Sequence, residues 1–236
     1  MMVTTPVAYP ITVNVTPAAG GNASCTPNPV THGGSSTCSA TPATGYTFSG
    51  WSGACTGLSC TLGNVTAAQT VTATFAINSY TVTASSAGNG SITPASQPVA
   101  HGGTASFTVT PATGYHVASV SGDTCTVTGS GSSYSAANIG ADCAVTATFE
   151  RTTYTVTPSV GSGSGTISPD TAQTINANDT FNFVLSPAPG QVISHVDGTC
   201  GGALVADVFT IAPATADCTV IAHFADIAIF KDGFEE

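Results

Sequence analysis

The stretch VTATFA, Val71 to Ala76, returns as VTATFE at Val145 to Glu150 and, less closely, as VIAHFA at Val220 to Ala225. In the first two stretches, valine, alanine and phenylalanine alternate with threonine, and this period of two predicts a strand with one apolar face. The three stretches begin 74 and 75 residues apart. A fixed period of this length indicates tandem modules that each end on the same strand.

Other short stretches recur at the same interval. HGG follows Thr31 and Ala100, TPATGY starts at Thr41 and at Thr110, and SPAPGQ from Ser186 is its third version. We therefore predict three copies of one domain followed by a short acidic tail, over residues 1–76, 77–150, 151–225 and 226–236.

The composition favours small β-modules, because Thr, Ser, Val, Ala and Gly dominate and runs of good helix formers are missing. In the second copy, Ala105, Phe107 and Val109 alternate with hydroxyl side chains, as in a half-buried strand. The stretch AGNG, Ala87 to Gly90, predicts a hairpin turn because Asn and Gly tolerate positive φ. We predict an all-β fold of three tandem modules, with five or six strands and at most one helical turn per copy.

The charge distribution is unusual. Two Lys and Arg residues stand against twelve acids, and none of these fourteen residues precedes Asp123. Nucleic-acid binding is excluded as a function, because neutralising phosphates requires clustered Lys and Arg. No segment of the sequence is long enough to span a membrane. Eight cysteines, an even number, indicate an oxidising compartment, so we expect a secreted or cell-surface protein.

The first residues, MMVTTPVAYPITVNVTP, contain neither the basic segment nor the apolar run of a signal peptide. We therefore expect a mature fragment, an expressed piece or the C-terminal part of a longer surface protein.

The order of motifs is similar to the divergent bacterial repeat of the internalin B type B-repeat family. The motifs are a strand, GNG, a second strand, HGG, a third strand, TPATGYTFSGWSGAC, a variable loop and VTATF. The resemblance covers about residues 9–225 and is weakest in the third copy, where Gln191 replaces the tyrosine and Val196 the tryptophan. It implies β-grasp-like modules of secreted or surface bacterial proteins, with a non-catalytic role in adhesion, spacing or partner contact. The family shares no catalytic residues, so none is carried over, and we expect no cofactor.

Trp51, the only tryptophan, stands among glycines in SGWSGAC. An exposed Trp51 near Tyr46 would offer a surface on which a glycan could stack. The corresponding positions in the other copies are Val120 and Val196, and a position that accepts valine is usually in the core. We predict that Trp51 is buried, and a ligand contact by Trp51 and Tyr46 is the alternative.

Histidine and cysteine in the first copy formally offer a zinc site, because His32 lies between Cys25 and Cys38 in the sequence, with Cys55 and Cys60 nearby. However, His101 occupies the same HGG position in a copy without counterparts of these two cysteines. We therefore attribute the histidine to the turn and predict no metal site. The remaining histidines fall on predicted strands and are expected to be solvated or lightly hydrogen-bonded: His116, His195 and His223.

The carboxylates and serines do not form a catalytic motif. The stretch GSGSG, Gly161 to Gly165, has glycine where a G-x-S-x-G motif places its nucleophile. The first copy has no carboxylate, so an acid pair shared by the repeats is excluded. We predict a protein that is not an enzyme. A weak calcium site is an open alternative at the acids that flank cysteines, Asp123, Asp142, Asp197 and Asp217.

The four cysteines of the first copy allow three pairings. Alignment of the copies places Cys25 on Ile92 and Cys38 on Phe107, which are apolar positions on strands predicted to be neighbours. A disulfide between Cys25 and Cys38 can therefore cross the core that the other copies fill with hydrocarbon.

This pairing leaves Cys55 to bond with Cys60. In the later copies Cys125 and Cys200 hold the position of Cys55, and their partners lie on the inward side of the last strand. We expect four bonds, each within one module: Cys25 to Cys38, Cys55 to Cys60, Cys125 to Cys143 and Cys200 to Cys218.

Two classes of function follow. One is an adhesive or stalk-like structural segment of a bacterial surface or secreted protein. The other is a binding module for a glycan or protein, accessory to an upstream enzyme domain, with self-association into fibres by strand addition as a variant. The partners expected are a host or cell-surface protein, a glycan or another copy of the chain. The tail, with IFKDGFE at 229–235, is either a sorting or docking peptide, an added edge strand or a frayed terminus.

Overall fold

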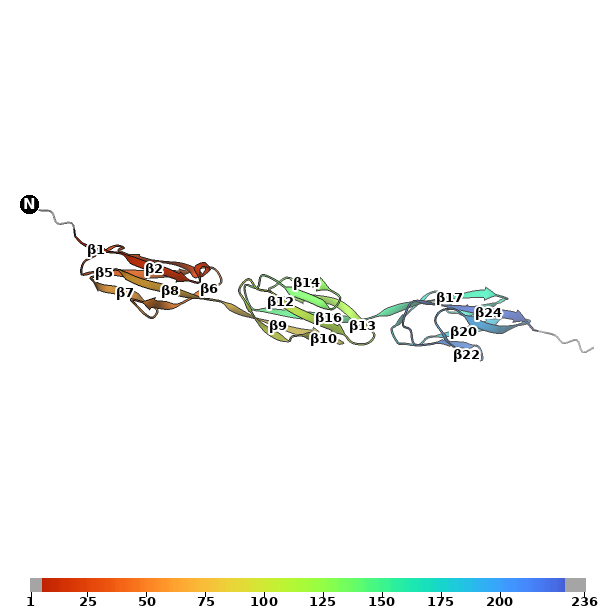
Figure 1. Ribbon diagram of the computed structural model, residues 1–236. Helices are drawn as coiled ribbons and strands as arrows, with labels where there is room; N and C mark the ends of the chain where they lie inside the picture. The colour runs from red at the N-terminus through yellow and green to blue at the C-terminus, as the bar shows by residue number, and fades with distance from the viewer. Residues whose placement is uncertain (1–5, 228–236) are drawn as a thin grey trace, which may run out of the picture. The chain divides into compact units, whose positions relative to one another are not determined.

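The computed structural model describes residues 6–227, and within them the chain is nearly all β (Figure 1). The one helical segment of these residues is the short 3-10 turn η1 (Ala18–Gly20). The predicted all-β class is therefore confirmed, whereas the β-grasp likeness stays a prediction. No helix in the described part is long and apolar enough to cross a membrane. Most of the acidic tail lies outside the described residues.

The strands that hydrogen-bond to one another fall into three sets along the sequence, which we call the first, second and third modules: 8–77, 79–151 and 153–226. The first module has a sheet in the order β2-β8-β6, a sheet in the order β3-β5-β7, and a ribbon of β1 and β4. Its strands are β1 (Ala8–Tyr9), β2 (Ile11–Thr16), β3 (Gly21–Thr26), β4 (Val30–Thr31), β5 (Gly34–Pro42), β6 (Tyr46–Gly53), β7 (Cys60–Val65) and β8 (Gln69–Ile77).

The second module has two four-stranded sheets, in the orders β11-β9-β16-β13 and β10-β12-β15-β14. Its strands are β9 (Ser79–Ala87), β10 (Gly90–Thr93), β11 (Ser96–Ala100), β12 (Ala105–Pro111), β13 (Tyr115–Gly122), β14 (Val127–Ser130), β15 (Ser133–Ala136) and β16 (Cys143–Arg151).

The third module repeats this arrangement strand for strand, in the orders β19-β17-β24-β21 and β18-β20-β23-β22. Its strands are β17 (Thr153–Ser162), β18 (Gly165–Ser168), β19 (Gln173–Asn176), β20 (Asn182–Pro187), β21 (Gln191–Asp197), β22 (Gly202–Val205), β23 (Val208–Ile211) and β24 (Cys218–Asp226). The repeated topology supports the third copy inferred from its blurred motifs.

The repeated VTATF stretch forms the last strand of each module, and that strand is an inner strand of its sheet. In β16, Val145, Ala147 and Phe149 are buried, and the residues between them are partly exposed. The same alternation occurs in β8 and β24. Because these inward side chains join the core while the strand has neighbours on both sides, the stretch recurs with little change.

A glycine near the start of the second strand leaves space for the phenylalanine that ends this stretch. A Cβ on Gly165 would lie 2.6 Å from ring atoms of Phe224, and a Cβ on Gly90 would likewise overlap the ring of Phe149. Only glycine lets backbone and ring approach this closely. This contact explains why a glycine at this position and the final phenylalanine occur together in the second and third copies.

Each module contains more strands than the five or six predicted. The described residues hold eight strands per module. The prediction was wrong mainly at the segment taken as a cysteine loop, which in the second module contains β14 and β15 as an antiparallel pair. These short strands carry Ser, Thr and Gly, and this composition is equally typical of loops.

The two sheets of a module share one core. In the first module, buried side chains of β2 and β8 pack with those of β3, β5 and β7 in a single cluster. In the third module, side chains of β17 and β24 pack with those of β18, β20 and β23. Sheets that are apolar on the inner face and rich in hydroxyls on the outer face form such sandwiches.

Candidate functional site

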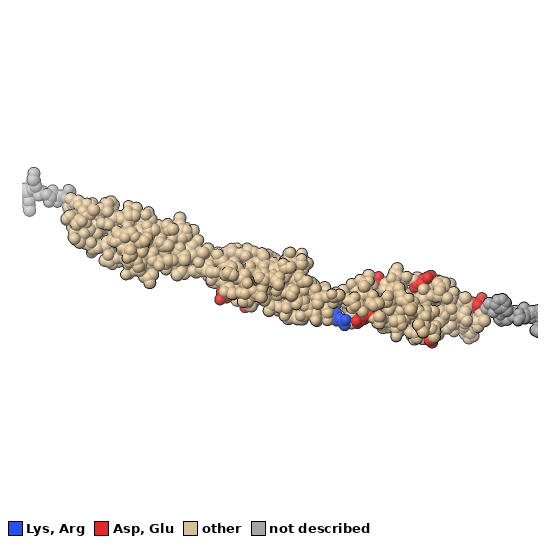
Figure 2. Space-filling view, turned by 60° about the horizontal axis from the view of Figure 1, so that its bottom comes forward, with Lys and Arg blue, Asp and Glu red and all other residues tan. Residues whose placement is uncertain are grey.

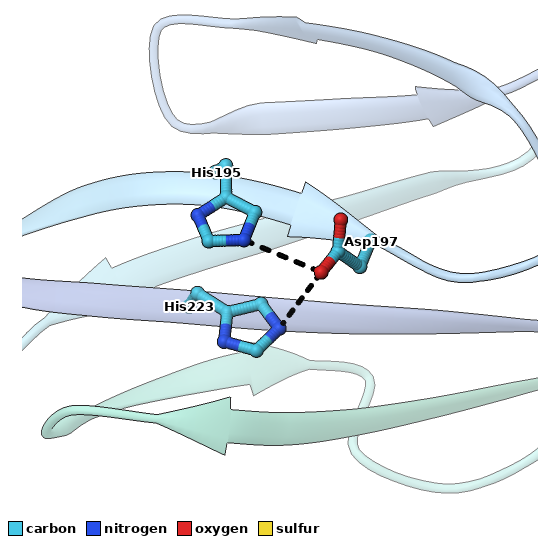
Figure 3. Close-up of side chains that lie close together, drawn as sticks. All are labelled: His195, Asp197 and His223. Atoms are coloured by element: carbon cyan, nitrogen blue, oxygen red, sulfur yellow. Dashed lines mark hydrogen bonds and ion pairs between the residues drawn. The ribbon is translucent and has the colours of Figure 1, made fainter.

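Three polar side chains converge on the outer face of the β19-β17-β24-β21 sheet. His195 and Asp197 belong to β21 and His223 to the adjacent strand β24 (Figure 3). The Nε2 atoms of His195 and His223 lie 3.3 and 3.4 Å from the same oxygen, Oδ2 of Asp197. The imidazole rings are stacked, with centroids 4.4 Å apart and planes inclined by 3°. We call these three residues the His-Asp-His cluster.

Strand register brings the cluster together. His195 and His223 are directly paired across β21 and β24, and Asp197 follows His195 by two residues, so it lies on the same face. The pairing shifts between Ile193 and His195, which makes Ser194 a bulged residue. Bulges change where the following side chains point, and here the change aligns His195 with His223.

A second bulge supports His223 from the other side. The parallel pairing of β17 with β24 shifts between Val160 and Ser162, so Ser162 is opposite His223 and Gly161 is the extra residue. A Cβ on Gly161 would lie 2.8 Å from Nε2 of His223 and even closer to another ring atom. Glycine at this position leaves room for the imidazole ring.

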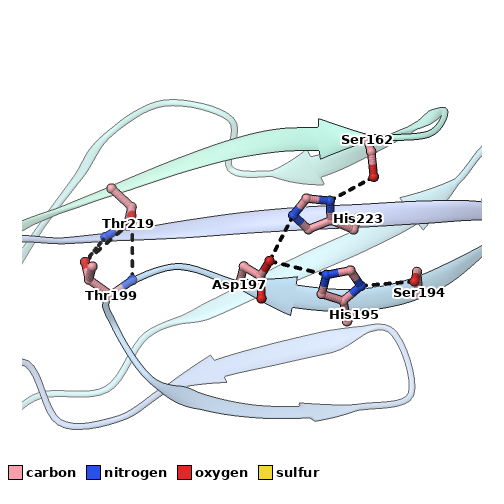
Figure 4. A network of polar contacts seen from close by, with 7 residues as sticks. All are labelled: Ser162, Ser194, His195, Asp197, Thr199, Thr219 and His223. Atoms are coloured by element: carbon pink, nitrogen blue, oxygen red, sulfur yellow. Dashed lines mark hydrogen bonds and ion pairs between the residues drawn. The ribbon is translucent and has the colours of Figure 1, made fainter.

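Serine hydroxyls contact the other nitrogen of each ring (Figure 4). Oγ of Ser162 lies 2.8 Å from Nδ1 of His223, and Oγ of Ser194 lies 3.0 Å from Nδ1 of His195. Each imidazole therefore has its Nδ1 at a hydroxyl and its Nε2 at the carboxylate. The side chain of His223 is 19% exposed, whereas those of His195 and Asp197 are 54% and 60% exposed, so the cluster is open to solvent.

Two threonines, Thr199 and Thr219, hold the chain just after β21 ends at Asp197 (Figure 4). The backbone N–H of Thr219 donates to Oγ1 of Thr199 at 3.0 Å, and the backbone N–H of Thr199 donates to the carbonyl of Thr219 at 3.1 Å. These bonds, next to the disulfide between Cys200 and Cys218, fix the end of β21 relative to β24.

Trp51 lies in the core of the first module, with 5% of its surface exposed. Its ring meets Phe48 edge-on, at a centroid distance of 5.7 Å. Tyr46 is partly buried and packs against the same core. A tryptophan buried in this way has no open face for a glycan, so its burial does not support the alternative of a ligand contact by Trp51 and Tyr46.

All eight cysteines are paired within modules: Cys25 with Cys38, Cys55 with Cys60, Cys125 with Cys143, and Cys200 with Cys218. Cys25 and Cys38 are directly opposite each other on β3 and β5. The four cysteines near His32 are therefore not available as zinc ligands. His32 instead lies with its Nδ1 3.4 Å from the hydroxyl of Tyr9.

Three of the four aspartates that flank the cysteines accept backbone hydrogen bonds. Oδ1 of Asp123 accepts from the N–H groups of Ala144 at 2.8 Å and Thr124 at 2.6 Å, and these bonds lower the pKa of the Asp123 carboxyl. Asp142 accepts from the N–H of Thr81 and Asp217 from that of Thr155, each at 2.8 Å. These contacts give the carboxylates a role in holding loops to strands, independent of calcium.

The His-Asp-His cluster is the one group of metal-ligating side chains found among the described residues. Sequence reasoning placed His195 and His223 on strands but treated each by itself. Two sequence features together could have predicted the cluster. One is the spacing His195-x-Asp197 on a single strand, and the other is the repeat alignment, which places His223 on the neighbouring strand.

These features define a class, a tandem all-β repeat protein in which each module contains at least one disulfide. Residues 11–79 and 80–153 each match the family model of the divergent InlB B-repeat domain. The two segments cover more than half of the chain, and the chain belongs to this family. The third module lies outside both segments, although it repeats the strand order of the second.

No curated protein matches the chain. Among solved structures, an I-band fragment of titin aligns over 94% of this chain and 98% of its own length, at 8% identity and a TM-score of 0.16. A TM-score this low carries no argument about the fold or function of the chain.

Proposed function

We propose that the chain is a non-catalytic repeat segment of a bacterial secreted or surface protein, and that it acts outside the cell as a stalk or adhesive spacer that resists mechanical tension. Membership of the B-repeat family supports a repeat module. The disulfides in each module support an oxidising location.

The parallel pairing of a strand near the start of the module with its last strand is the observation that carries the proposal. In the first module, Ile11 to Thr16 pair in parallel with Gln69 to Thr74. In the third module, β17 and β24 pair in parallel as well. Tension applied at the two ends of such a module pulls these strands past each other, so the hydrogen bonds between them are loaded together rather than one at a time. A module of this kind resists stretching along the chain.

The surface fits an extracellular role. The chain has only two cationic side chains, Arg151 and Lys231, and residues 1–122 contain no Asp, Glu, Lys or Arg. In Figure 2 the acidic side chains accordingly lie on the later modules. Few peptide bonds are open to trypsin-like proteases, and this supports a long life outside the cell.

Two observations favour the alternative of a binding module. A hollow in the second module is lined mostly by hydroxyl side chains, with Tyr134 and Phe107 among them, and this lining suits a glycan. In the third module β22 is an edge strand with Leu204 and Val205 exposed, which suits strand addition by another copy. Both remain secondary, because neither is repeated in all three modules.

Single-molecule force spectroscopy tests the proposal. The full chain is stretched from its termini, and as a control the third module is pulled through non-cysteine handles at Val192 and Ala225. These two residues are paired in the antiparallel β21 and β24, so pulling there opens the bonds one by one. We expect clearly higher unfolding forces for terminal pulling.

The double variant Cys200→Ala/Cys218→Ala identifies the unfolding of the third module. The two cysteines are 18 positions apart, so loss of this disulfide alone lengthens the extension of the third module by about 60 Å, while the bond between Cys125 and Cys143 stays intact. Equal unfolding forces in the two pulling geometries would contradict the proposed resistance to tension.

A further inference from the structure

We propose that the His-Asp-His cluster of the third module is a binding site for a divalent metal ion such as Zn²⁺. Its ligands are Nε2 of His195, Nε2 of His223 and Oδ2 of Asp197. Two imidazoles and one carboxylate form a ligand set that zinc accepts with a fourth position left open. The inference is independent of the mechanical role proposed above.

The distances agree with such a site. Ligand atoms that bind one zinc ion tetrahedrally at about 2.0–2.1 Å lie about 3.3 Å from one another. The two Nε2 atoms are 3.3 and 3.4 Å from Oδ2 of Asp197, and all three ligand atoms lie within 4.8 Å of one another. Small rotations of the half-exposed His195 and of Asp197 would bring the two nitrogens onto one ion.

The hydroxyl contacts orient both rings for metal binding. A histidine that binds a metal through one nitrogen commonly donates the N–H of the other to an oxygen acceptor. The oxygens of Ser162 and Ser194 lie where they can accept from Nδ1 of His223 and His195. This tautomer leaves the lone pair of each Nε2 directed at the shared position beside Asp197.

The other modules indicate that the fold does not require these residues. The position of His195 is occupied by Ser119 in the second module, and that of His223 by Thr148. Their hydroxyl oxygens make the same cross-strand contact, at 2.7 Å. Ser121 stands at the position of Asp197. Hydroxyl side chains therefore suffice for the sheet, and three ligand-type residues occur together only in the third copy.

A Ser-His-Asp catalytic triad explains the cluster less well. Ser162, His223 and Asp197 do form a hydrogen-bonded chain. A triad, however, has no role for a second imidazole stacked on the first and directed at the same carboxylate oxygen. A metal ion uses all three groups.

The test is zinc titration of the full chain, with disulfides intact, any affinity tag removed and metal stripped by EDTA. We expect calorimetry to give one Zn²⁺ per chain, and NMR to show the imidazole signals of His195 and His223 shifting together. Calcium should not bind in this way, because it prefers oxygen ligands.

The two variants of the histidine ligands introduce the residues that the second module has at these positions, so the sheet should tolerate them. His195→Ser and His223→Thr should each abolish the one-to-one binding, whereas the control His116→Ala should bind as the parent does. Ser162→Ala keeps all three ligands and should weaken binding about 10- to 100-fold, as is usual when the group that orients a metal ligand is lost. Circular dichroism verifies that each variant is folded.

Two results would overturn the proposal. One is the absence of stoichiometric zinc binding by the parent chain. The other is unchanged affinity in the folded His195→Ser and His223→Thr variants, which would place the ion elsewhere.

Discussion

At the scale of single residues, Trp51 shows how one side chain serves the fold of one module. It occupies a position that holds Val120 and Val196 in the other copies, and its ring fills the first core against Phe48. The larger side chain goes together with cysteines at Cys25 and Cys38, where the second copy has larger apolar residues. The first core is thus filled by one larger aromatic side chain and two smaller cysteine side chains.

We expect Trp51→Ala to lower the free energy of unfolding of the first module by about 3 to 5 kcal/mol, because the cavity left by the indole cannot close. Denaturant unfolding measures the change, with Trp51→Phe as the milder control. In the parent, fluorescence from this single tryptophan should be blue-shifted and shielded from acrylamide. Strong quenching in the folded chain would show that the ring is exposed.

At the scale of strands and crosslinks, the disulfides join different elements in different modules. In the first, Cys25 and Cys38 link the neighbouring strands β3 and β5. In the later two, Cys143 and Cys218 on the last strand are linked to the loop that follows β13 or β21. The bond between Cys25 and Cys38 thus joins two strands of one sheet and does not cross the core as predicted, whereas the bonds of the later modules tie a loop to the inner strand.

We expect the double variant Cys125→Ala/Cys143→Ala to destabilise the second module by about 2 to 4 kcal/mol. The disulfide joins residues 18 positions apart and thereby lowers the conformational entropy of the unfolded chain. Calorimetry of the full chain measures the shift. Peptide mapping of the parent without reduction, using pepsin because tryptic sites are scarce, provides the control. A disulfide between two modules, or free thiols in the parent, would contradict the pairing.

At the scale of the whole molecule, each module has its own paired sheets and its own disulfides. The boundaries near residues 76 and 150 stay a prediction. At about 75 residues a module has a modest core, and the disulfides add to its stability.

We expect residues 77–150, expressed alone and oxidised, to fold into the second module, because the strand pairs and the disulfide of this set are internal to it. Dispersed amide signals in NMR and a cooperative thermal transition would be the positive result. A fragment that stays disordered while the full chain folds would show that the modules depend on one another.

The sequence alone determined the repeat, the strand character of its motifs and the inward positions of the last strand, because a period of two within a strand is a local property. Comparison of the copies also predicted which cysteines pair, since equivalent positions share a place in the core. The short strands β14 and β15 were missed, because their Ser, Thr and Gly residues give no clear period.

Only the tertiary structure decided that His195, Asp197 and His223 meet. Their convergence depends on how β21 and β17 are registered against β24, and on the bulges at Ser194 and Gly161 that shift this register. A shift of one residue sends a side chain to the opposite face of a sheet. Register between strands is set by packing and pairing across the whole module, so the contact between these three side chains does not follow from their spacing along the chain alone.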